Sequence, residues 1–135
     1  MKYYIDTSLA VALVYERDPN HERAVKVYPK DGERVISTLV LAELYSVYSR
    51  RMNISDEELE ALVNYTVIKC GSKLEEVEFD KVVDYAVKIS NMVKLKTLDL
   101  LHLATSVLMG SEILSLDEEI LEAKRRLKVN SLEGH

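Results

Sequence analysis

The chain has 135 residues, 47% of them apolar, which suits one domain with one substantial hydrophobic core. Cys70 is the only cysteine, which excludes an internal disulfide bond and a cysteine-rich zinc site, and the histidines lack zinc-binding spacing. There is no apolar run of membrane-spanning length and no secretory-type segment at the N-terminus, so we expect a cytoplasmic protein with no membrane partner.

In chain order, the sequence predicts strands that alternate with helices. Short apolar runs define the strands. The helices are defined by the helical spacing of apolar residues and by polar caps, such as the capping box at Ser55–Glu58 and the start at Asp18-Pro19. We expect strands at residues 2–6, 34–37, 74–77, 112–116 and 128–130. We expect helices at residues 8–15, 19–28, 38–52, 56–68, 80–92, 97–109 and 118–127.

This alternation predicts an α/β fold in which helices flank a mostly parallel central sheet. We expect residues 1–135 to form a single domain, because there is no linker, internal repeat or low-complexity segment. In such sheets, functional sites form at the carboxyl ends of the strands.

Four carboxylates lie inside or at the end of otherwise apolar runs: Asp6 in YYID, Glu43 in STLVLAEL, Asp99 in KTLDLLHLA and Asp117 in ILSLD. A buried carboxylate is costly unless it is paired, hydrogen-bonded or bound to a cation. Asp6 and Asp117 lie at the ends of expected strands, and the other two lie near helix starts, so all four are expected at one edge of the sheet. Clustered carboxylates repel one another unless cations intervene, and their hard oxygen atoms favour Mg²⁺ or Mn²⁺.

Each acid also has an ordinary structural explanation. Asp6 and Asp117 occupy N-cap positions, and Asp99 lies in a first helical turn, where the helix dipole favours negative charge. Glu43 is equally well explained as an exposed residue at the edge of an apolar stripe. His102 lies three residues after Asp99 on the same helix face, where it either orients that carboxylate or is a hydrogen-bonded core histidine.

The net charge of −5 does not exclude a nucleic-acid partner. The four acids account for four of these negative charges, so bound divalent cations would leave the remaining surface close to neutral. We therefore expect any contact with RNA or DNA to be local to the acidic site.

The segments YIDTSLAVAL, STLVLAEL, LKTLDLLHLATS and ILSLDEEIL resemble, in order and spacing, the four motif regions of PIN-domain nucleases. The resemblance covers essentially the whole chain and is closest to the small VapC-type toxins of toxin–antitoxin pairs. It implies a three-layer PIN-like fold and an endoribonuclease that depends on Mg²⁺ or Mn²⁺. Asp6, Glu43 and Asp99 match the acidic triad and Asp117 matches the fourth acid, so all four are expected to bind metal and to be catalytic.

The resemblance also implies supporting residues and partners. Ser8 and Ser115 fall where family members often contact the ligands or a water molecule. The family forms homodimers and binds a protein antitoxin that inserts a segment near the acidic pocket. Candidates for holding the RNA backbone, with ordinary solvated charges as the alternative, are Arg50, Arg51, Lys94 and Lys96.

Other functions stay open at this point. A haloacid-dehalogenase-like phosphatase would need a DxD motif after the first strand, where this chain has Asp6-Thr7-Ser8, and a receiver domain would need adjacent acids near that strand. A PIN nuclease of RNA maturation without a toxin role is one alternative. A catalytically silent PIN-like binding module is another.

Overall fold

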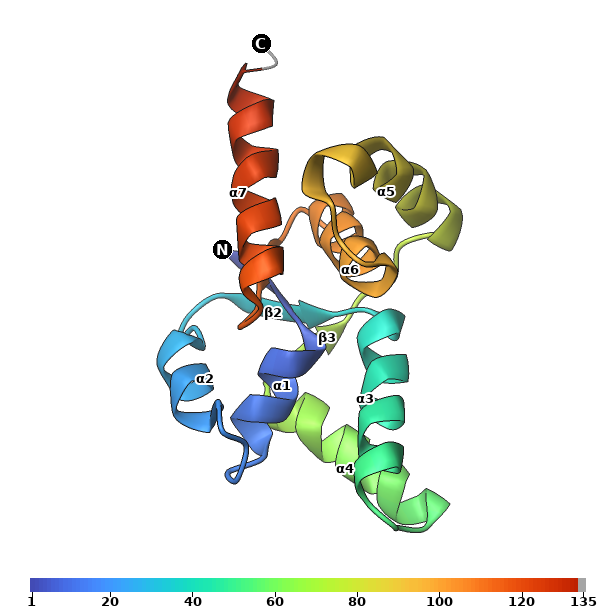
Figure 1. Cartoon of the computed structure of the whole chain (residues 1–135). Helices are drawn as coiled ribbons and strands as arrows, with labels where there is room; N and C mark the ends of the chain where they lie inside the picture. The colour runs from blue at the N-terminus through green and yellow to red at the C-terminus, as the bar shows by residue number, and fades with distance from the viewer. Residues whose placement is uncertain (134–135) are drawn as a thin grey trace.

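The computed structural model describes residues 1–133, and the side chains of residues 1–130. The strands are β1 (Lys2–Ile5), β2 (Glu33–Ile36), β3 (Lys73–Leu74) and β4 (Glu112–Leu114). The helices are α1 (Thr7–Val14), α2 (His21–Val27), α3 (Thr38–Arg51), α4 (Asp56–Lys69), α5 (Phe79–Val93), α6 (Thr97–Leu108) and α7 (Glu118–Glu133) (Figure 1).

The four strands form one parallel sheet in the order β3-β2-β1-β4. Strand β1 lies inside the sheet, where Tyr4 is in register with Val35 of β2 on one side and with Ile113 of β4 on the other. These three residues are fully or almost fully buried, as expected for a sheet covered on both faces.

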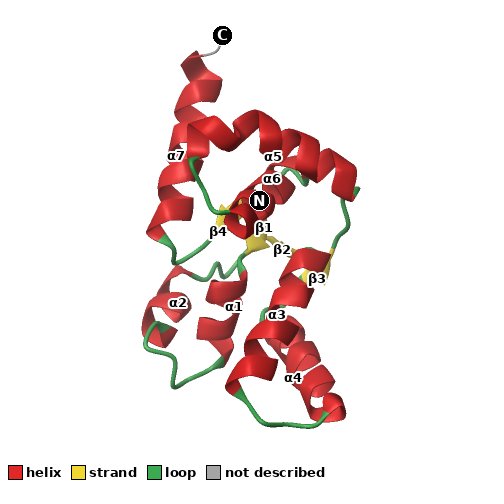
Figure 2. Ribbon diagram, turned by 45° about the vertical axis from the view of Figure 1, so that its right-hand side comes forward, coloured by secondary structure: helices red, strands yellow, loops and turns green. Residues whose placement is uncertain are grey.

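Helices cover both faces of the sheet and make three layers (Figures 1 and 2). The chain steps from β1 to β2 to β3 in one direction and then steps back across the sheet to β4. Because such crossovers are right-handed, the reversal places α1–α4 on one face and α5–α7 on the other. The expected three-layer α/β fold with a parallel sheet is therefore confirmed.

Helix α5 shows how the sequence pattern produces the packing. Its buried residues, Val82, Ala86, Ile89 and Val93, recur at helical spacing and form one apolar face. This face lies against α6 and α7, its main neighbours in the fold. Burial of each Val or Ile side chain contributes about 1.5–3 kcal/mol, so this face fixes the helical layer that carries Asp99 and His102.

Local turn chemistry sets where α4 begins and where α6 ends. The capping box of α4 is confirmed, because Ser55 Oγ accepts a hydrogen bond from Glu58 N and Glu58 Oε1 accepts one from Ser55 N. At the end of α6, Gly110 adopts a left-handed conformation with φ of 66°, which a side chain would disfavour. The chain thereby turns from α6 directly into β4.

Several expected boundaries differ from the structure, and one expected strand is absent from residues 1–133. Residues 128–130 were predicted as a strand, but they continue α7, because Ile120, Ala123 and Leu127 keep the helical spacing that packs this helix on the core. Helix α2 begins at His21 rather than at Pro19, since Asp18 Oδ1 accepts a hydrogen bond from Asn20 N and closes a turn there. Within residues 1–133, no helix combines the length and apolar character needed to cross a membrane.

Candidate metal centre

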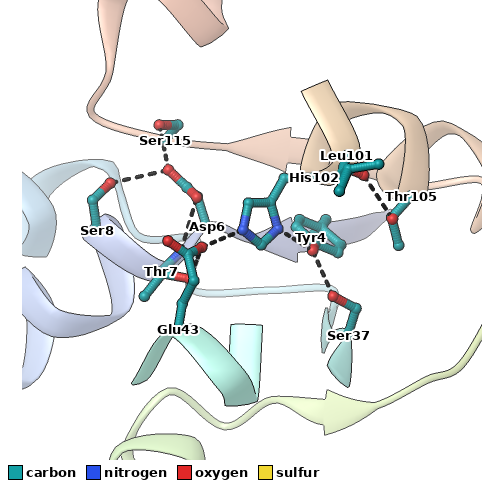
Figure 3. A network of polar contacts seen from close by, with 10 residues as sticks. All are labelled: Tyr4, Asp6, Thr7, Ser8, Ser37, Glu43, Leu101, His102, Thr105 and Ser115. Carbon is teal, nitrogen blue, oxygen red and sulfur yellow. Dashed lines mark hydrogen bonds and ion pairs between the residues drawn. The ribbon is translucent and has the colours of Figure 1, made fainter. Parts of the chain in front are cut away.

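Asp6 lies immediately after β1 at the carboxyl end of the sheet and is only 5% exposed. It is the N-cap of α1, and its Oδ1 accepts a hydrogen bond from Thr7 N at 2.9 Å. Its Oδ2 accepts hydrogen bonds from Ser8 Oγ at 3.0 Å and from Ser115 Oγ at 2.7 Å (Figure 3). Donors from both ends of the chain therefore fix the orientation of this carboxylate.

Ser115 connects the ends of two neighbouring strands. It follows β4, and its hydroxyl both donates to Asp6 and accepts a hydrogen bond from Asp117 N at 3.0 Å. The Asp117 carboxylate accepts a hydrogen bond from Glu119 N at 2.8 Å and so caps α7. Asp117 thus has the structural role that its position predicts, and it also lines the same pocket as Asp6.

Glu43 lies in the second turn of α3, with its carboxylate directed at the same place. Its Oε1 accepts hydrogen bonds from Thr7 Oγ1 at 2.8 Å and from His102 Nε2. Burial alone would raise the pKa of Glu43, but the hydrogen bond and charge of His102, together with the Thr7 hydroxyl, hold it below its ordinary value. The carboxylate is therefore charged at neutral pH.

His102 contacts a different acid from the one that its spacing predicts. Sequence spacing favours Asp99, three residues earlier, but the ring nitrogens bind Glu43 and the hydroxyl of Tyr4, the latter at 2.6 Å. The Tyr4 hydroxyl also lies 2.7 Å from Ser37 Oγ. His102 is 1% exposed, and burial raises the pKa of Tyr4 well above its ordinary value, so this phenol stays protonated.

Asp99 lies in the first turn of α6, and its environment disfavours a negative charge. Burial raises the pKa of Asp99, and the charges of Asp117, Asp6 and Glu43 raise it further. His102 opposes this effect only in part. The acids therefore repel one another across the site, and a bound cation would relieve that repulsion.

All four predicted acids line one pocket of about 270 Å³ at the carboxyl end of the sheet. Within it, Asp6, Glu43 and His102 each offer a ligand atom, and these atoms lie within 4.8 Å of one another. Two further residues of the connection between α1 and α2 line the pocket, Asp18 and Asn20. The sequence did not predict them, because Asp18-Pro19 was interpreted as the start of a helix. Nor did the sequence predict Thr7, whose only signal was its hydroxyl directly after Asp6.

The four predicted cationic residues lie in different environments. Arg51 lines the pocket on the same face of α3 as Glu43, two helical turns further along. Arg50 points elsewhere and donates to Ser46 O at 3.1 Å. Lys94 donates to Asn91 Oδ1 at 2.6 Å, and Lys96 is the exposed N-cap residue of α6; neither lines the acidic pocket.

The donor set fits a hard divalent cation. Carboxylate oxygens are the ligands that Mg²⁺ and Mn²⁺ prefer. Among residues 1–130, no Lys or Arg forms an ion pair with any of the four acids, although ion pairs neutralise several acids elsewhere. The site thus holds uncompensated negative charge in a small, partly buried space.

Fold and site together define a three-layer α/β domain with a carboxylate pocket at the carboxyl end of a parallel sheet, where the strand order reverses. The model of one family, the PIN domain, matches residues 3–126. The chain belongs to the PIN domain family.

Solved structures of similar fold include VapC toxins. Mycobacterium tuberculosis VapC20, a toxin that cleaves the sarcin-ricin loop, is 18% identical with a TM-score of 0.70, covering 90% of this chain and 94% of that chain. Rickettsia felis VapBC2, bound to a DNA fragment from its promoter, is 16% identical with a TM-score of 0.64 and coverages of 87% and 88%. VapBC-1 from nontypeable Haemophilus influenzae is 16% identical, with a TM-score of 0.64 and coverages of 96% and 94%. At such identities the likeness shows the fold alone, and no curated protein matches the chain.

Proposed function

We propose that this protein is an endoribonuclease that depends on Mg²⁺ or Mn²⁺ and serves as the toxin of a type II toxin–antitoxin pair. One observation carries the proposal: four carboxylates from four separate segments line a single pocket in a chain of the PIN domain family. Burial and then the charges of the neighbouring acids raise the pKa of Asp99, and this crowding of carboxylates supports a bound cation as their partner.

In this proposal, Asp6, Glu43, Asp99 and Asp117 hold the cation. When bound, it would supply charge neutralisation and Lewis acidity toward a phosphodiester and would lower the pKa of water. The protein contributes by fixing the ligands: Ser8 and Ser115 orient Asp6, and the Thr7 hydroxyl orients Glu43. The expected products carry a 5′-phosphate and a 3′-hydroxyl.

Arg51 is the proposed contact to the RNA phosphates nearest the reaction. It lines the pocket and makes no ion pair with residues 1–130, so its guanidinium is available for an anionic ligand. Arg50, Lys94 and Lys96 lie outside the pocket lining, and we propose that they bind the RNA backbone farther from the cleaved bond.

The structural neighbours support the proposed biological context. One is a toxin that cleaves a specific RNA loop, and two are VapBC structures. From these neighbours we extend to this protein an RNA substrate and a protein antitoxin. From the resemblance to VapC-type toxins we also propose a homodimeric assembly and a cytoplasmic location. Light scattering of the purified protein alone and after co-expression with a small open reading frame directly upstream tests both interactions.

An RNA end-mapping assay with purified protein tests the activity. We expect cleavage that requires Mg²⁺ or Mn²⁺, is abolished by EDTA, and is lost in Asp6→Asn and Asp99→Asn. Asp84→Asn is a matched control, because this exposed acid of α5 lies outside the pocket. Cleavage that survives the combined loss of Asp6 and Asp99 would refute the assigned site.

A further inference from the structure

A buried chain of hydrogen bonds lies behind the acidic pocket and ends on one of its carboxylates. It runs from Ser37 through Tyr4 and His102 to Glu43, and its members come from different elements (Figure 3). We propose that this chain holds the Nε2–H group of His102 toward Glu43 and thereby keeps Glu43 in its metal-binding position before any cation is bound. His102 is then a positioning residue rather than a ligand. The inference rests on the proposed metal site.

Both ring nitrogens of His102 are engaged in this chain. An ionised carboxylate can only accept hydrogen bonds, so the proton between His102 and Glu43 belongs to Nε2. The other nitrogen, Nδ1, forms a hydrogen bond with the Tyr4 hydroxyl, which also forms one with the Ser37 hydroxyl. These contacts hold the imidazole with its Nε2–H directed at Glu43.

The protein encloses this chain of hydrogen bonds. Tyr4 and His102 are at most 1% exposed, and Ser37 is also buried, so water does not compete for these hydrogen bonds. The two rings also pack against each other, with centroids 5.7 Å apart, which restricts rotation of the imidazole.

Geometry alone would allow His102 to bind a cation, because its ligand atom lies within 4.8 Å of those of Asp6 and Glu43. A ligating ring nitrogen must offer an unprotonated lone pair. Nε2 carries the proton shared with Glu43, and Nδ1 faces Tyr4, so neither nitrogen is available. Hard cations also prefer the oxygen atoms around them.

The hydrogen bonds leave one oxygen of Glu43 free. Thr7 and His102 both donate to Oε1, and no donor among residues 1–130 occupies Oε2. Two donors on one oxygen fix the rotation of the carboxylate and leave the other oxygen for a cation. Such partners of metal ligands typically contribute about 10- to 100-fold to metal affinity.

NMR of the wild-type protein with ¹⁵N-labelled histidine tests this donor role directly, and His102→Asn identifies the signal. We expect Nε2 of His102 to be protonated in the metal-free protein and to keep its proton in saturating Mg²⁺. An unprotonated Nε2 in the metal-free protein would overturn the proposal. Loss of the Nε2 proton on Mg²⁺ binding would overturn it as well, because His102 would then be a ligand.

A pair of variants tests the positioning of Glu43. Tyr4→Phe and Tyr48→Phe each delete one buried phenol hydroxyl. Among residues 1–130, the Tyr48 hydroxyl contacts only Thr66 Oγ1, at 2.8 Å, and it takes no part in the hydrogen bonds that lead to Glu43. Calorimetric titration with Mn²⁺ should show affinity about 10-fold weaker for Tyr4→Phe and within about twofold of wild type for Tyr48→Phe. Equal affinity in both variants would refute the proposal. If the proposed function itself were wrong, wild-type protein would fail to bind Mn²⁺ or to cleave RNA.

Discussion

The hydroxyl of Ser115 should contribute far more to stability than that of Ser8, although both donate to the same oxygen of Asp6. Ser115 is 7% exposed, and its hydroxyl lies 2.7 Å from Asp6 Oδ2 while also accepting from Asp117 N. Ser8 is exposed and donates to the same oxygen at 3.0 Å. Water can replace the Ser8 hydroxyl. Ser115→Ala removes the buried donor to Asp6 Oδ2, which keeps only the exposed Ser8 hydroxyl, and it deprives the half-buried Asp117 N–H of its acceptor.

The difference is large enough to measure. A buried hydrogen bond to a charged group contributes about 1.5–3 kcal/mol to the free energy of unfolding, whereas an exposed one contributes about 0.5 kcal/mol. The unfolding entropy of a 135-residue chain is about 0.28 kcal/mol/K. Ser115→Ala should therefore lower Tm by roughly 5–10 °C, and Ser8→Ala by about 2 °C.

Thermal and urea unfolding of both variants in EDTA, followed by circular dichroism, would measure these losses without a contribution from metal. The comparison depends on the burial of the two hydroxyls and not on their chemistry, which is identical. A loss in Ser8→Ala as large as that in Ser115→Ala would refute the reasoning.

Three further predictions concern other residues. Asp99→Asn should raise the Tm of the metal-free protein at pH 7 by a few degrees. Folding raises the pKa of Asp99, so the stability of the wild-type protein falls as the pH rises through that pKa. At pH 3 this carboxyl is protonated in the folded and the unfolded state, so the gain in Tm should vanish. Thermal unfolding at both pH values measures this, and an equal gain at both would contradict it. Arg51→Ala should raise KM for RNA and reduce the salt dependence of RNA binding by the equivalent of about one phosphate contact. Arg50→Ala should have a smaller effect, because Arg50 lies outside the pocket lining. RNA-binding assays across a salt series would show whether the two variants differ. Cys70 is buried, and burial raises its pKa to about 11, so it should react with a thiol reagent slowly in native protein and rapidly in urea; fast native labelling would argue against the packing there.

Much of the fold could be predicted because its signals are local. The apolar runs and caps identified most elements, and alternation of strands and helices required a parallel sheet. Asp6 and Asp117 could be placed together because both follow strands, and such ends meet at one edge. The strand expected at 128–130 failed because three residues carry too little pattern to oppose the helical spacing that precedes them.

The details of the site depend on contacts between distant segments, which no local pattern records. His102 was paired with Asp99 by helical spacing, but its partner, Glu43, is 59 residues away on another helix. Tyr4 lies in β1 two residues before Asp6, and this spacing of two was the only sign in the sequence of its place behind the pocket. Asp18 and Asn20 reach the pocket through the path of a connection, which follows from tertiary packing.

The central position of β1 has a consequence for how the protein is made. Strand β4, the last to be synthesised, pairs with β1, the first, and the Asp6–Ser115 hydrogen bond joins residues 109 apart in sequence. Contacts of such long range form late and slowly. A chain still growing on the ribosome lacks β4, Ser115 and Asp117, so it cannot hold the assembled pocket. On the proposed function, synthesis itself therefore delays activity until the chain has been made beyond Asp117.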